Sequence, residues 1–116
     1  MDELIGRLVA ETGIERDVAE KAVGIILAFL VKEGPADKVK ALLDRMPGAE
    51  AAANAHAGGG GMGGIMGAGT QLMGIGLGMG QVQSVTRVVI GYAREKAGED
   101  VVGEIVGAIP GLSQFT

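Results

Sequence analysis

The sequence predicts an all-α protein, a compact helical bundle made of two pseudo-repeated three-helix units that share one core. Apolar residues recur at the i, i+3, i+7 and i+10 spacing of a helix face in two separate segments. A shift of about 63 residues places one segment on the other without a gap. No segment shows the strict alternation that strands require, and the composition of 47% hydrophobic and 21% charged residues is typical of a globular domain.

The proposed repeat depends mainly on matched helix-breaking residues. Pro47-Gly48 falls on Pro110-Gly111 under the shift, and Asp37 falls on Asp100. Apolar positions between these markers also coincide, Val39 with Val102 and Leu42 with Ile105, and so do positions upstream of them, Ala22 with Val85 and Phe29 with Tyr92. The two halves therefore have one helical pattern despite few identical residues.

Unit one, residues 1–48, contains three expected helices. The first spans about 2–12 and stops at Gly13, a residue type that favours the left-handed conformation after a helix. The second spans about 15–33 and ends at Gly34-Pro35, since a proline disfavours helical geometry in the preceding residue. The third begins at Pro35 and runs to Pro47-Gly48.

Unit two, residues 65–116, repeats this order. Its expected helices span about 65–75, about 79–97, and from 98–100 to Pro110-Gly111. Leu112 and Phe115 then form a short tail that is expected to pack back on the core. The Ala/Gly-rich residues 49–64 form a joint between the units, and the four glycines at 58–61 are its most flexible part.

The residues that enzymes use for catalysis are scarce in this chain. There is no cysteine, so disulfides and thiolate metal ligands are excluded, and the only histidine, His56, lies in the joint without a rigid frame. Gly59, Gly61 and Gly64 match a dinucleotide-binding spacing, but no strand precedes them as that motif requires. We therefore expect no enzymatic activity, no catalytic residue, no metal and no cofactor.

The charge pattern limits which kinds of partner the protein is expected to bind and where in the cell it is expected to be. The net charge is −4, and the ten basic residues are interleaved with fourteen acidic ones, so no basic stripe is available for nucleic acid. The acidic start of the chain does not resemble a secretory signal, which favours a cytoplasmic location.

Residues 51–86 are unusual because they contain no Asp, Glu, Lys or Arg. Within them glycines recur at four-residue spacing, which on a helix makes a groove that another backbone can approach closely. Methionines flank the glycines with adaptable apolar side chains. The first helix of unit two lies in this stretch. It is either buried inside the chain's own fold, or part of an interface with a partner protein or a second copy, or in contact with a membrane. The candidate interface residues are Gly63, Gly67, Gly74, Gly78, Met66 and Met73.

The absence of catalytic chemistry, together with this bare apolar segment, favours a non-enzymatic protein-interaction or assembly module. The expected partner is another protein or a second copy, with no small-molecule ligand evident. The alternative is a membrane-associated protein that uses the Gly/Met-rich segment 62–80, which is formally long enough to span a bilayer. Against it, about half of residues 58–80 are glycine, and no aromatic or basic residue marks an interface.

The segment Ala108-Ile109-Pro110-Gly111-Leu112, with the Gly-rich stretch upstream, resembles small bacterial helical proteins known only as domains of unknown function. The resemblance covers mainly residues 64–116 and reaches the first half through the repeat. It implies an all-helical fold and carries no activity or site residues.

Overall fold

In the computed structural model, residues 2–55, 64–109 and 111–115 are described. Within these ranges the chain is all-helical and contains no strand, as the sequence predicts. The helices are α1 (Asp2–Thr12), α2 (Arg16–Glu33), α3 (Ala36–Asp44), α4 (Ala49–Ala55), α5 (Gly64–Gly74), α6 (Met79–Ala97) and α7 (Glu99–Ala108), followed by the short 3₁₀ helix η1 (Leu112–Phe115).

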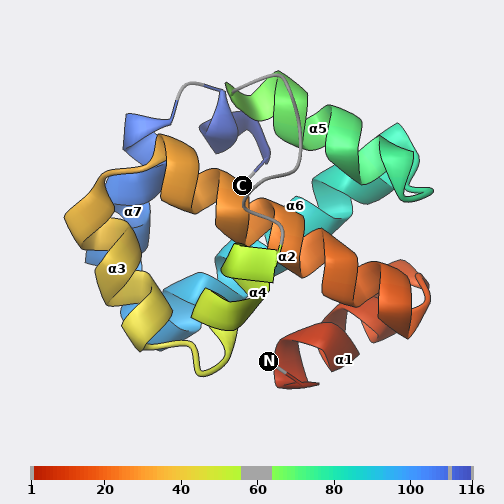
Figure 1. The fold of residues 1–116 in the computed structure, drawn as a ribbon, viewed down its shortest axis with the longest axis horizontal. Coiled ribbons are helices and arrows are strands. Elements are labelled where there is room, and N and C mark those ends of the chain that lie inside the picture. The colour runs from red at the N-terminus through yellow and green to blue at the C-terminus, as the bar shows by residue number, and fades with distance from the viewer. Residues whose placement is uncertain (1, 56–63, 110, 116) are drawn as a thin grey trace.

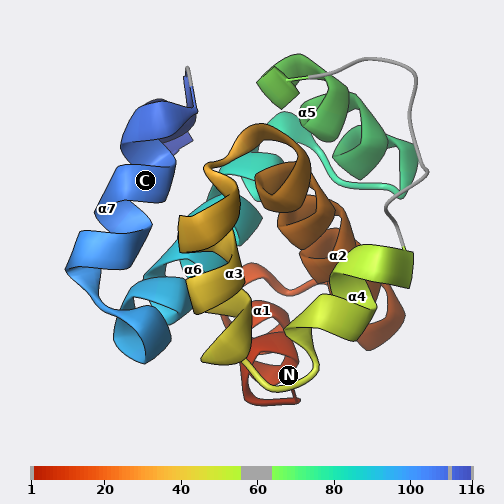
Figure 2. The ribbon, with the colours of Figure 1, turned by 60° about the vertical axis from the view of Figure 1, so that its left-hand side comes forward.

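The two longest helices, α2 and α6, contact each other in the middle of the molecule. Helix α1 packs against both of them on one side, and α5 packs against both on the opposite side (Figure 1). At one end α3 and α7 pack side by side, which both views show (Figure 2). The resulting body measures 31 × 30 × 25 Å.

Helix α2 is the most enclosed element because its sequence is apolar around most of its circumference. Residues 22–27 are all buried, and α2 contacts five other helices: α1, α3, α4, α5 and α6. A helix that is apolar nearly all round must be buried on nearly all sides. The core therefore surrounds α2, and the other helices cover it.

The residues expected to form only a joint contain a helix. In α4, Ala49 and Ala53 are buried against α2, while Glu50 and Asn54 are exposed. Alanine has the highest helix propensity, and its small side chain permits close packing of two helices. The glycine run at 58–61, expected to be flexible, lies outside the described residues.

Both third helices end earlier than predicted. Helix α3 stops at Asp44 and α7 at Ala108, two or three residues before the Pro-Gly pairs. Proline disfavours helical geometry before it, so the chain leaves the helix in a tighter turn. The amide of Met46 donates to the carbonyl of Leu43 at 3.1 Å in one turn, and that of Ile109 donates to Val106 at 3.3 Å in the other.

Gly34 is a glycine that the packing requires. A Cβ atom there would lie 2.8 Å from the carbonyl oxygen of Leu30 and 2.8 Å from Cγ2 of Val39. It thus allows α3 to turn back closely on the end of α2. Gly91, in the middle of α6, is the opposite case, because a Cβ atom there would have nothing within 4 Å.

We expect Gly34→Ala to lower the free energy of unfolding by about 1–3 kcal/mol, because the added methyl group overpacks the α2–α3 turn. The matched variant Gly91→Ala should raise it by up to about 1 kcal/mol, because alanine favours the helix and has room. Urea titration followed by circular dichroism measures both. Wild-type stability in Gly34→Ala would contradict the tight turn.

Candidate functional site

The largest exposed apolar side chains are three methionines near one another in sequence. Met66 is 70% exposed and Met73 45% exposed on α5, and Met79 is 67% exposed at the first position of α6. They are three of the four exposed large hydrophobic residues in the described part of the chain. We call these three residues the methionine surface.

The sequence of α5 gives it two faces. Gly67, Ala68 and Leu72 are buried, and α5 contacts α2 and α6. Met66 and Met73 are seven residues apart, which places them on one side of the helix, two turns from each other. Because α5 contains no charged residue, its exposed side presents no charged group to water and supplies no partner for an ion pair.

The candidate interface residues predicted from the sequence are divided by the structure. Met66, Met73, Gly74 and Gly78 are exposed, whereas Gly67 is buried; Gly63 lies outside the described residues. A Cβ atom added at Gly74 would have nothing within 4 Å, and one added at Gly78 would meet only Oε1 of Gln81. No other helix of the described chain therefore approaches these two glycines closely, and their role at an interface stays a prediction.

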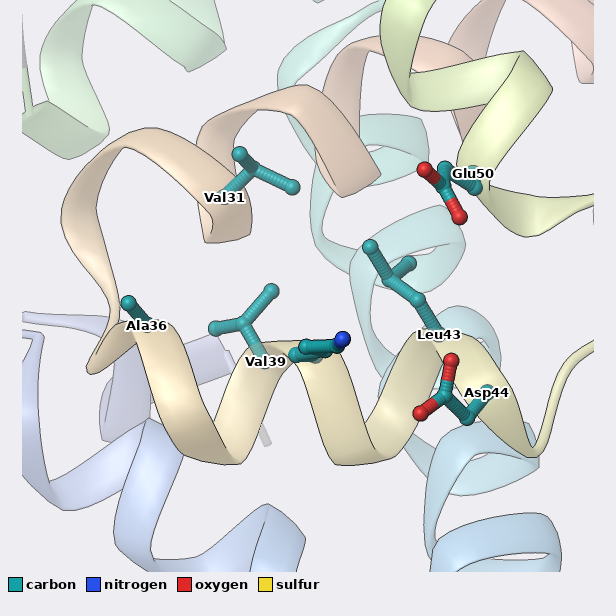
Figure 3. A pocket seen from close by; sticks show the side chains of 7 residues that line it. Val31, Ala36, Val39, Leu43, Asp44 and Glu50 are labelled. Carbon is teal, nitrogen blue, oxygen red and sulfur yellow. The ribbon is translucent and has the colours of Figure 1, made fainter.

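A cleft also opens between the end of α2, helix α3 and the start of α4 (Figure 3). Its volume is about 240 Å³. Its walls are the apolar side chains of Val31, Ala36, Val39 and Leu43, and its polar residues are Lys40, Asp44 and Glu50. Sequence reasoning missed the cleft because one wall is α4, which was not expected to be a helix.

A second cleft, of about 430 Å³, lies between α1, α2 and α4. It is lined by Asp2, Ile5, Glu20, Lys21, Gly48, Ala52 and Ala55. The described lining residues of the two clefts include no Ser, Thr, Cys or His. In the described ranges no group of three His, Cys, Asp or Glu side chains is placed to hold a metal ion.

A polar cluster joins α1 to α6. Arg7 donates two hydrogen bonds to the carboxylate of Glu95, one of them from Nη2 at 2.9 Å, and Lys96 lies 3.5 Å from the carboxylate of Glu3. The ring of Tyr92 lies between the two cations, 5.3 Å from Arg7 and 5.4 Å from Lys96. The guanidinium of Arg7 lowers the pKa of Glu95, and burial raises the pKa of Tyr92. Every group in the cluster has a partner within it, so we interpret the cluster as a structural clamp.

No described helix is both long enough and apolar enough to cross a membrane. Helix α5 is 11 residues long, and the chain turns at 75–78 before α6 begins. His56, considered and rejected as a catalytic base, lies outside the described residues.

The Arg7–Glu95 pair predicts a pH-dependent part of the stability. Because the pKa of Glu95 is lowered from 4.5 in the folded state, acidification protonates the unfolded chain first. The contribution of the pair is complete above pH 4.5 and is lost as the pH falls through the lowered pKa. We expect Glu95→Gln to melt below the wild type at pH 7, with the difference closing in that acidic range.

Calorimetry from pH 7 down to about pH 3 measures this difference. The control is Glu11→Gln, which removes an exposed carboxylate from α1 that makes no ion pair with a described residue. If the difference in melting temperature between Glu95→Gln and the wild type were the same at all pH values, it would contradict the Arg7–Glu95 pairing.

The resemblance of residues 64–116 to bacterial helical domains of unknown function stays a prediction. The function of this chain is therefore inferred from the contacts, exposure and charge of its own residues. No protein-family model, no curated protein and no solved structure matches this chain.

Proposed function

We propose that the protein is a non-enzymatic interaction or assembly module, and that its partner is a second copy of the chain bound through the methionine surface. The observation that carries this proposal is the exposure of Met66, Met73 and Met79 in a region without charge. Met66 and Met73 lie on one side of α5, and neighbouring exposed apolar side chains mark interaction sites more often than isolated ones do. Methionine suits such a surface because its flexible thioether adapts to different contours.

We also propose that the bundle is a repeat of two three-helix units, 1–48 and 65–116, joined by residues 49–64. In support, the helix starts are related by the same shift of 63 residues: α2 starts at 16 and α6 at 79, and α3 starts at 36 and α7 at 99. Gly48 and Gly111 have φ values of 87° and 86°, and Gly13 and Gly76 both have positive φ as well. The contacts are also reciprocal, since α1 packs on α6 and α5 packs on α2.

The repeat makes the methionine surface informative. The shift of about 63 residues pairs Glu3 with Met66 and Ala10 with Met73, and all four side chains are exposed. At the first of these paired positions, α1 has the carboxylate of Glu3, which pairs with Lys96, whereas α5 has Met66. Exposed helix positions ordinarily carry charge, so the apolar choice in unit two favours a role in binding.

The charge distribution indicates where a second copy binds. The chain carries a net charge of −4, so two copies repel each other through most approaches. That repulsion is weakest at residues 51–86, which carry none of the charge. The methionine surface is therefore where two copies meet with the least electrostatic cost.

Light scattering coupled to size exclusion, over a range of protein concentrations, tests the proposal. We expect the wild type to reach the mass of a dimer. The double variant Met66→Glu/Met73→Glu should raise the dimer Kd by roughly 100-fold or more, because burying an unpaired carboxylate costs several kcal/mol.

Val31→Glu is the matched control, because Val31 is 47% exposed but lies in the α2–α3–α4 cleft rather than on α5. It should dimerise like the wild type. A wild type that stays monomeric at every concentration, or equal weakening by Val31→Glu, would contradict the proposal. Flotation of the monomer with lipid vesicles would instead favour membrane contact.

A further inference from the structure

The methionines of this chain fall into two classes of solvent exposure. Met66, Met73 and Met79 are 70%, 45% and 67% exposed, whereas Met46, after the end of α3, is 1% exposed. Met1 and Met62 lie outside the described residues. In the unpaired chain, an oxidant dissolved in water thus reaches these three side chains directly and Met46 only after the core opens.

The exposed methionines are also the ones whose chemical change the fold tolerates. Helix α5 is held on α2 through its other side, where Ala68 and Leu72 are buried. Met79 occupies the first position of α6, and its side chain points into solvent. Making these three side chains polar changes the surface and leaves the core packing as it is.

We propose that Met66, Met73 and Met79 form a reversible oxidation site for hydrogen peroxide that controls pairing of the chain. The control of pairing rests on the proposed function; the oxidation itself does not. The thioether sulfur attacks one peroxide oxygen, so that an S–O bond forms as the O–O bond breaks. The departing hydroxide takes the proton of the oxygen now bound to sulfur and leaves as water. The sulfur is oxidised by two electrons to a sulfoxide, and the peroxide is reduced.

The reverse step needs a thiol-dependent sulfoxide reductase. Two thiols supply two electrons, the sulfoxide oxygen leaves as water, and a disulfide forms on the reductase. A sulfoxide is strongly polar, so three of them convert an apolar surface into a hydrated one. Because residues 51–86 carry no charge, no ion pair remains there to hold two copies together.

The first measurement is the oxidation rate of each methionine. The full-length protein, diluted until it is monomeric, is treated with hydrogen peroxide, quenched with catalase and analysed by fragment-ion mass spectrometry; the remainder is concentrated for the measurement of mass. We expect Met66 and Met79 to oxidise at least ~10-fold faster than Met46, with Met73 between them, and the melting temperature to stay unchanged. Equal rates at Met46 and Met66, or unfolding that accompanies oxidation, would overturn the inference whatever the oligomeric state.

The second measurement is the mass of the same samples by light scattering. Oxidation should convert dimers to monomers, and treatment with methionine sulfoxide reductases of both stereospecificities plus thiol should restore them. The control variant Met66→Leu/Met73→Leu/Met79→Leu keeps the apolar volume without the oxidisable sulfur, so it should stay dimeric in peroxide.

These outcomes separate the two proposals. A dimer that persists with all three sulfoxides in place would overturn the switch and leave the proposed function standing. A protein that is monomeric before oxidation would overturn the proposed function and the control of pairing together. The oxidation site would then be tested by the order of the methionine oxidation rates alone. Earlier elution of the oxidised form from a phenyl column would show that its surface had become more polar.

Discussion

The structure depends on the burial of α2. Its residues 22–27 are buried on every side, so the fold exists only if other elements cover that helix all round. The helices that do so are short: α1 and α5 have 11 residues, α3 has nine and α4 has seven. Helices of these lengths are not stable alone in water. Each is helical because its neighbours offer it an apolar surface: α2 for α4 and α5, α2 with α6 for α1, and α2 with α6 and α7 for α3. Helix α2 in turn is buried because these helices and α6 are all present.

The first helices of the two halves cover the core by different means. Arg7 of α1 is fixed to α6 by a bidentate ion pair with Glu95 and lies over the ring of Tyr92. Helix α5 has no charged residue and packs on α2 through small or single aliphatic side chains such as Ala68 and Leu72. Charged groups with a strict geometry help to position α1, whereas burial of apolar side chains helps to position α5.

Several features of the fold could be predicted because local chemistry determines them. Gly13 ends α1 with φ of 74°, and Gly34-Pro35 ends α2, so both boundaries follow from nearby residues. Helix α4 was missed because an alanine run beside glycines resembles a linker until α2 is there to bury it. The Arg7–Glu95 pair joins residues 88 positions apart and has no local signal. For α5, periodicity groups Met66 with Met73, but only the position of α2 determines which side faces inward.

The glycine content of α5 also bears on how a partner would act on it. Gly67 and Gly69 lie inside this helix, and each costs about 1 kcal/mol relative to alanine. A Cβ atom added at Gly69 would have nothing within 4 Å, so close packing within the chain does not account for that glycine. A helix with this composition is stabilised less by its own propensity than by its contacts. In the proposed dimer, a second copy bound at Met66 and Met73 would add contacts that only the helical form makes, and by linkage it would stabilise α5. The proposal therefore couples assembly to the order of this helix.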